Sequence, residues 1–128
     1  MGRFVPNKPA IKHLLRSPDG MVADHFHTLS KRTVRLAKAQ VGVDTGALKA
    51  SISYTLRASG APIVSRIGSK NKIAYLHHEG TSPHVIRAKK AQTLRFKSHG
   101  RIVYAKVVNH PGTKPNRYLT DSLAAVIG

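Results

Sequence analysis

The segment Ile73–Pro83 reads Ile-Ala-Tyr-Leu-His-His-Glu-Gly-Thr-Ser-Pro, and its second half returns in a close variant at His110–Pro115. Both copies follow the pattern His-x-Gly-Thr-x-Pro, with His78 and His110 in the first position. Glycine permits a positive φ, the threonine hydroxyl can bond nearby backbone groups, and proline fixes φ, so each copy predicts a tight turn. The two copies are either ordinary tight turns or a rigid docking edge for a partner subunit.

The residues between the turns alternate in the manner of paired strands. Leu94 and Phe96 fall on one side of a predicted strand, and residues 101–108 alternate again after a tight turn at residues 98–100. We therefore expect the two turns to bracket a hairpin and to lie together at one end of a sheet. Residues 73–80 fit a strand or a short helix, because periodicity does not decide between them at this length.

The most regular pattern in the chain lies upstream, over residues 21–41. Apolar residues recur there at steps of three and four, interrupted only by Thr33 and Gln40, which predicts a long amphipathic helix. Asp24 in the first turn and the cations later in the helix suit the helix dipole. Before it, residues 1–10 predict an extended arm, and a short helix follows that ends at Pro18–Gly20.

Shorter elements complete the prediction. Asp44 or Thr45 is a good N-cap for a helical turn through Ala50, and Gly46 sits where a close backbone approach would help. Residues 53–58 and 63–69 predict a hairpin that turns at residues 60–62. Asn116 can cap a final helix over residues 117–127. The sum is a single α+β domain over residues 1–128, with one long amphipathic helix packed on a mainly antiparallel sheet and a short C-terminal helix.

The charge of the chain is strongly unbalanced. Lys and Arg number 22 against 5 Asp and Glu, a formal net charge of +17. Such an excess opposes an isolated compact monomer and favours a polyanionic neighbour, namely nucleic acid, a membrane surface or an acidic protein face. The chain has no cysteine, no apolar run as long as a membrane span, and no signal-peptide core at its N-terminus. We expect a soluble protein made in the cytoplasm.

Catalytic and metal-binding patterns are sparse. The five acidic residues are scattered, and we find no nucleophile elbow and no phosphate-binding glycine loop, so an enzyme is disfavoured and no cofactor is expected. The histidines lack a His-x-x-x-His helix pair, which leaves a metal-dependent enzyme only as a remote alternative. The residues with nitrogen or oxygen atoms that could in principle bind a metal are His77, His78, Glu79, His84 and His110.

Nucleic-acid binding would rest on charge rather than on base reading. Aromatic residues are few and tryptophan is absent, so stacking platforms for bases are not expected. The candidate phosphate-facing cations fall on the long helix and on the basic turn after residue 88, although a solvated face explains the helical ones equally well. These candidates are Lys31, Arg32, Arg35, Lys38, Lys89 and Lys90.

Taken in order, several short motifs resemble the tail-completion, or head–tail connector, proteins of long-tailed bacteriophages. The motifs are Val43-Asp44-Thr45-Gly46-Ala47-Leu48, then Ala74-Tyr75-Leu76 with Glu79-Gly80-Thr81, then Pro83-His84-Val85-Ile86, and last His110 to Asn116 with Tyr118-Leu119. The resemblance covers about Leu29 to Leu123. Arg117 departs from it, because a proline is expected there.

The resemblance implies a virion structural protein of the phage neck without catalysis. It implies a ring, six-fold in this interpretation, whose neighbours are the head-completion or stopper protein, the tail terminator and the tail tube, with genomic DNA passing along the axis. Our hypothesis is that the loop and both turns make contacts between subunits or between rings. The residues are Asp44, Thr45, Gly46, Leu48, His78, Glu79, Gly80, Thr81, Pro83, His110, Gly112, Thr113 and Pro115.

The rival hypothesis is a free, basic protein that binds nucleic acid without sequence preference. Such a protein should bind duplex DNA as a monomer or dimer, with an affinity that falls steeply as salt rises. A neck protein should instead recognise other virion proteins. The two hypotheses therefore differ in the partner that the purified chain selects.

Overall fold

The structure, a computed structural model, describes residues 2–58 and 62–128. The chain divides into two compact units. Unit 1 comprises Met1–Ala74 and Arg117–Gly128, and unit 2 comprises Tyr75–Asn116. The predicted α+β class is confirmed, with a long helix packed on antiparallel strands and a short C-terminal helix.

Unit 1 contains most of the helical residues. Its helices are α1 (Lys8–Arg16), α2 (Met21–Gln40), α3 (Ala47–Ser51) and α5 (Tyr118–Ile127). The side chain of Asn7 caps α1 by accepting a hydrogen bond from the Ala10 N–H at 3.2 Å. The helix therefore begins inside the predicted extended arm of residues 1–10, whose last three residues are helical. The bounds of α2 match the predicted 21–41 within one residue.

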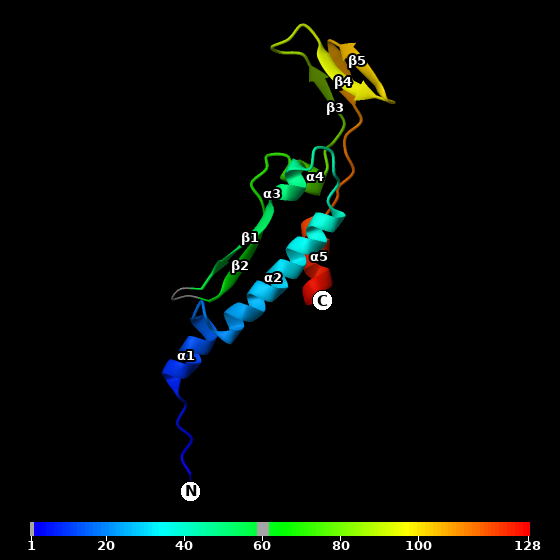
Figure 1. The fold of residues 1–128 in the computed structure, drawn as a ribbon. Coiled ribbons are helices and arrows are strands. Elements are labelled where there is room, and N and C mark those ends of the chain that lie inside the picture. Colours follow the sequence, from blue (N-terminus) through cyan, green and yellow to red (C-terminus); the bar gives the residue numbers. More distant parts are fainter. Residues whose placement is uncertain (1, 59–61) are drawn as a thin grey trace. The chain divides into compact units, whose positions relative to one another are not determined.

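The strands of unit 1 form one antiparallel hairpin, β1 (Ile52–Arg57) with β2 (Val64–Ser69). Residues 60 and 61 of the predicted turn lie outside the described residues. Figure 1 shows α2 running alongside both this hairpin and α5. The core of the unit lies where these elements meet. Its buried members are Ala37, Val41, Leu48, Ile52, Ala74 and Tyr118.

Polar contacts join α2 to the hairpin at the positions where the buried face of α2 carries polar residues. The Ser30 hydroxyl lies 2.5 Å from the Ser65 hydroxyl, and His27 Nδ1 lies 3.0 Å from the phenol oxygen of Tyr54. Thr33 is fully buried and donates its hydroxyl hydrogen to the Leu29 carbonyl. A threonine on the predicted buried face is tolerated because its one strong polar group is satisfied within the helix.

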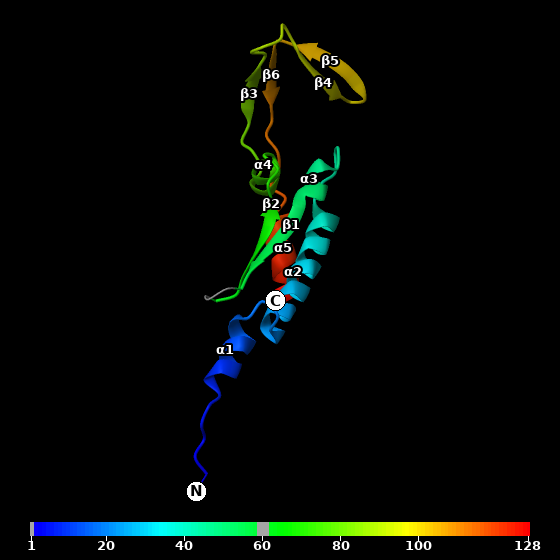
Figure 2. The same ribbon diagram turned by 60° about the vertical axis from the view of Figure 1, so that its left-hand side comes forward.

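Unit 2 is a long two-stranded ribbon preceded by a short helix. The undecided segment 73–80 is helical, as α4 (Ala74–Glu79), and the strands are β3 (His84–Arg87), β4 (Leu94–Ser98), β5 (Arg101–Ala105) and β6 (Val107–His110). Strand β3 pairs with β6, and β4 pairs with β5, both antiparallel (Figure 2). With the hairpin of unit 1, the strands form three two-stranded sheets instead of the single sheet that we expected.

The pairing register shows that one of the two paired strands of the ribbon contains an insertion. The Ala88 N–H donates to the Lys106 carbonyl and continues the β3–β6 ladder, whereas Leu94 already pairs with Ala105. Residues 89–93 are thus extra on one strand and form a loop that contains Lys89 and Lys90. We call residues 84–110 the basic ribbon.

Unit 2 has no hydrophobic core of its own. The structure describes all of Tyr75–Asn116, and none of these residues is buried. Leu94 and Phe96, which the sequence placed on one side of a strand, are only half-buried. A two-stranded ribbon in water is marginally stable without a packed face, so this unit lacks the usual source of stability.

Candidate functional site

The two His-x-Gly-Thr-x-Pro turns lie against each other. Thr81 and Thr113 form an isolated antiparallel bridge, and each backbone N–H donates to the other residue's carbonyl at 3.0 Å. Their hydroxyl oxygens are 2.7 Å apart, and the Thr113 N–H also donates to the Thr81 hydroxyl at 3.0 Å. The repeat seen in the sequence therefore corresponds to a direct contact between its two copies.

The glycines make this contact possible. Gly80 and Gly112 have φ of +75° and +87°, a region that residues with a Cβ avoid. A Cβ on Gly80 would lie 2.5 Å from the Thr113 carbonyl oxygen, and a Cβ on Gly112 would lie 2.2 Å from the Thr81 carbonyl oxygen. Each turn thus needs glycine for its own backbone conformation and for the approach of the other turn.

Further backbone pairing holds the two turns on both sides of the threonine bridge. On one side of the threonine bridge, His84 pairs with His110 at the end of the β3–β6 ladder. On the other side, the Asn116 N–H donates to the His77 carbonyl at 3.1 Å. The two copies of the motif are therefore held together on both sides of the bridge.

The histidines and Glu79 take part in this framework. His84 and His110 stack with ring centroids 5.0 Å apart, and His84 Nδ1 lies 2.8 Å from the Ser82 carbonyl, to which it donates. The Gly112 N–H donates to His110 Nδ1 at 3.0 Å, so the neutral ring carries its proton on Nε2. His78 Nδ1 lies 2.7 Å from the Glu79 carboxylate. Over residues 2–58 and 62–128, no group of three potential ligands is placed to hold a metal ion.

The Asp44–Leu48 loop differs from the prediction in two respects. Leu48 is 6% exposed and belongs to the core of unit 1, so its side chain does not face a partner as predicted. The N-cap of α3 is Gly46, not Asp44 or Thr45. Its φ is +83° and no atom lies within 4 Å of a Cβ built on it, so a positive φ explains this glycine and close backbone approach does not.

The predicted cap of the last helix also differs. Arg117 occupies the N-cap of α5 without a side-chain cap bond, while the Asn116 side-chain nitrogen lies 3.3 Å from His77 Nε2. Asn116 therefore connects the second turn to α4 instead of capping α5. Tyr118, the first residue of α5, is fully buried, and this burial raises the pKa of its phenol.

The predicted phosphate-facing cations fall into two groups, one in each unit. On α2 the side chains of Lys31, Arg32 and Arg35 are exposed, and Lys38 is half-buried. Both lysines of the loop at residues 89–93 are exposed.

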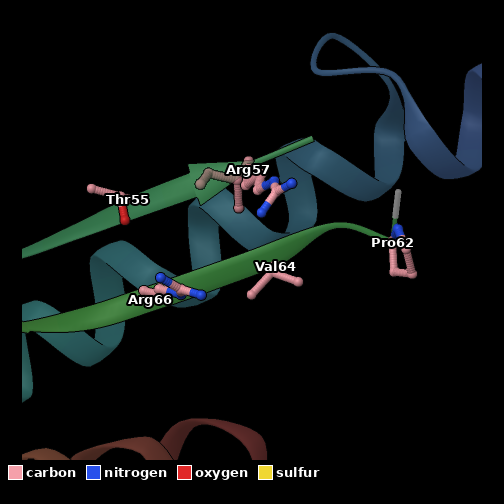
Figure 3. Close-up of a pocket in the computed structure, with 6 residues that line it drawn as sticks. Thr55, Arg57, Pro62, Val64 and Arg66 are labelled. Carbon is pink, nitrogen blue, oxygen red and sulfur yellow. The ribbon is translucent and has the colours of Figure 1, made fainter. Parts of the chain in front are cut away.

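Among the surface depressions of unit 1 are two that we describe by their chemistry. The smaller, of about 310 Å³, lies on the outer face of the β1–β2 hairpin, where Arg57 and Arg66 line it beside Thr55 and Val64 (Figure 3). The larger is a groove of about 610 Å³ between α2, β2 and α5. The groove is lined by Phe26, Leu29, Ser30, Thr33, Ser65, Ile67, Leu119, Thr120, Leu123 and Ile127.

The groove is notable for its chemistry, because none of its lining residues is charged. In a chain with a net charge of +17, such a surface can meet another copy of the chain without repulsion between like charges. The sequence pattern that relates to this groove is the pair of apolar stripes on α2 and α5. What the sequence could not show is that the stripes leave this groove open between them.

Comparison of the chain with protein-family models, with curated proteins and with solved structures found no match. Within the described part of the chain, no helix combines the length and the apolar character needed to cross a membrane.

Proposed function

We propose that this protein is a non-catalytic structural subunit of the neck of a long-tailed bacteriophage. In this proposal copies of the chain form a six-fold ring that joins the tail to the DNA-filled head. Its neighbours are the stopper, the tail terminator and the tail tube. The ordered motifs that resemble tail-completion proteins suggest the family, and the properties of the two units support a role in assembly.

The observation that carries the proposal is the absence of buried residues in unit 2. Tyr75–Asn116 presents large apolar side chains to solvent, among them Tyr75, Val85 and Tyr104, the last 63% exposed. A two-stranded ribbon that exposes its apolar residues gains little from folding alone. Contacts with other chains would bury these side chains and supply the missing stability, as expected for a subunit of a larger assembly.

The paired turns provide a rigid base for such contacts. Their backbone is fixed by the threonine bridge, and Pro83 and Pro115 just beyond it are exposed. A surface whose conformation is already fixed loses little entropy when a partner binds. We therefore keep the turns as the proposed contact between subunits or between rings.

We propose that a second copy of the chain binds at the uncharged groove of unit 1. Six chains of +17 each carry about +100, so copy-to-copy contacts must avoid bringing cations together. The groove between α2, β2 and α5 meets that requirement, and Leu123 at its side is 41% exposed. The remaining positive charge is then available to DNA or to an acidic neighbour.

Disruption of the gene in the phage or prophage that carries it tests this function. Electron microscopy of the lysate should show filled heads and finished tails that remain unjoined, and supplying the intact chain should restore whole particles. Normal infectious particles from the disrupted gene would overturn the proposal. Loss of heads or of tails alone would also overturn it, because the defect would then precede the joining step.

A basic protein that binds nucleic acid outside any virion is the second candidate. The seven cations of the basic ribbon, with no acidic residue among them, favour it. It predicts a monomer or dimer and normal joining of heads to tails. The same disruption experiment therefore separates the two candidates.

A further inference from the structure

We propose that the basic ribbon is a DNA-contacting arm, which binds the phosphates of a duplex without reading its sequence. The inference deepens the proposed function by naming the part of the chain that meets DNA. Only the location at which the chain meets DNA depends on the proposed function. The binding itself follows from the charge, exposure and strand register of unit 2.

Charge is the first argument. Between His84 and His110 the chain has seven Lys and Arg residues and no Asp or Glu. These cations repel one another. The ribbon has no acidic residue to pair with them and unit 2 has no buried residue, so neither charge pairing within the ribbon nor a core compensates the repulsion. A polyanion would remove the repulsion and release its own condensed counterions.

The register of the strands concentrates two of the cations on one face. Arg95 stands opposite Tyr104 and Lys97 stands opposite Ile102, and all four side chains are exposed. Alternate residues of a strand recur about every 6.8 Å on one face. That spacing is about twice the rise of roughly 3.4 Å between phosphates along the axis of one DNA strand.

The shape of the ribbon favours a duplex over an acidic protein surface. A two-stranded β-ribbon is narrow enough to enter the major groove of B-DNA, where phosphates flank it on both sides. Lys89 and Lys90 sit in the loop that interrupts one edge, so they add charge beside the strands.

Fluorescence anisotropy of the purified full-length chain with a labelled DNA duplex tests the arm. The test variant is Arg95→Gln with Lys97→Gln, and the matched control is Lys8→Gln with Lys12→Gln, which removes the same charge from exposed positions of α1. Each phosphate contact should be worth about eightfold in affinity near 0.1 M salt, since the logarithm of the affinity falls by about 0.9 per contact for each tenfold rise in salt.

We expect the ribbon variant to bind about 60-fold more weakly, with a salt slope reduced by about 1.8, and the control to change less than about threefold. Equal losses in both variants would overturn the inference, because the net charge alone would then explain binding. Unchanged binding by the ribbon variant would also overturn it, as would displacement of the DNA by polyglutamate at equal charge. Matching circular dichroism spectra show that both variants are folded.

The outcomes remain separable from those of the proposed function. Ribbon-dependent DNA binding by a chain whose gene is dispensable for joining heads to tails would support the arm and overturn the neck role. Joining defects without ribbon-dependent DNA binding would do the reverse.

Discussion

Replacing Gly112 with alanine tests whether the two turns are held together as described. A Cβ at this position would lie 2.2 Å from the Thr81 carbonyl oxygen and 3.0 Å from the Ser82 carbonyl carbon. Gly100, at the tip of the β4–β5 hairpin, is a matched control. Its φ of +79° is close to the +87° of Gly112, yet nothing lies within 4 Å of its Cβ position.

Both substitutions carry the energetic cost of a positive φ, but only Gly112→Ala also causes a steric clash. Both force a residue with a Cβ into the left-handed region, at about 1–2 kcal/mol. Gly112→Ala must also push Thr81 away, which breaks the two backbone hydrogen bonds of the threonine bridge. At about 1 kcal/mol for each bond, the bridge should lose about 2 kcal/mol more in Gly112→Ala than in Gly100→Ala.

Native-state hydrogen exchange followed by NMR measures this difference at the bridge itself. The amides of Thr81 and Thr113 should exchange about 30-fold faster in Gly112→Ala than in Gly100→Ala, the factor that corresponds to 2 kcal/mol. Gly80→Ala should behave like Gly112→Ala, since its Cβ would meet the Thr113 carbonyl oxygen. Equal exchange rates at the bridge in the Gly112 and Gly100 variants would refute the pairing of the turns.

Three further tests, which use four variants, address other parts of the description. Leu123→Asp should abolish ring formation without unfolding unit 1, because Leu123 lines the groove and is exposed; rings of unchanged mass in native mass spectrometry would exclude the groove as the contact. Leu48→Ala should lower the free energy of unfolding by about 2–5 kcal/mol in urea titrations, whereas exposed Asp44→Ala should change it by less than about 0.5 kcal/mol; similar values would contradict the burial of Leu48. Ser17→Ala should raise the pKa of Asp19 toward its usual range, since the Ser17 hydroxyl is the main cause that lowers it.

The lowered pKa of Asp19 has a defined sign in stability. The carboxylate is favoured in the folded chain, so its contribution is complete above the pKa of the unfolded chain and is lost as the pH falls through the lower folded value. Carbon-detected NMR titration of the Asp19 carboxyl in wild type and Ser17→Ala measures the shift directly. The same titration curve in both proteins would show that the hydroxyl does not stabilise the carboxylate.

The helices of unit 1 could be predicted well because their signals are local. The spacing of apolar residues predicted the bounds of α2 to within one residue, and Pro18–Gly20 marked the end of α1. The N-cap of α3 was missed because Asp44 and Thr45 are better caps by preference than Gly46. The backbone enters this helix with a positive φ, and that requirement outweighs the preference.

Unit 2 shows what a single sequence does not reveal. The repeated motif predicted two similar turns, but their direct pairing depends on the register of the strands between them. That register includes the extra residues 89–93, which no periodic pattern marks. Alternation placed Leu94 and Phe96 on one side of a strand, but such a pattern does not show whether anything covers that side.

The candidate site was predicted in part for the same reason. Gly80, Thr81, Gly112 and Thr113 were singled out from the repeat, and the structure brings them together in one bridge. The groove of unit 1 was not foreseen, since it arises between elements that are distant in sequence. Sequence patterns thus located the turns, while the open surfaces became visible only from the packing.

The most direct test of the neck proposal is the mass of the purified chain by native mass spectrometry, alone and with its neighbouring virion proteins. We predict a ring of six chains of 13.9 kDa, about 83 kDa in total, formed alone or on addition of a neighbouring ring protein. A monomer or dimer that stays unchanged with every neck and tail protein of its phage, yet binds duplex DNA at physiological salt, would contradict the proposal and favour the free nucleic-acid-binding protein.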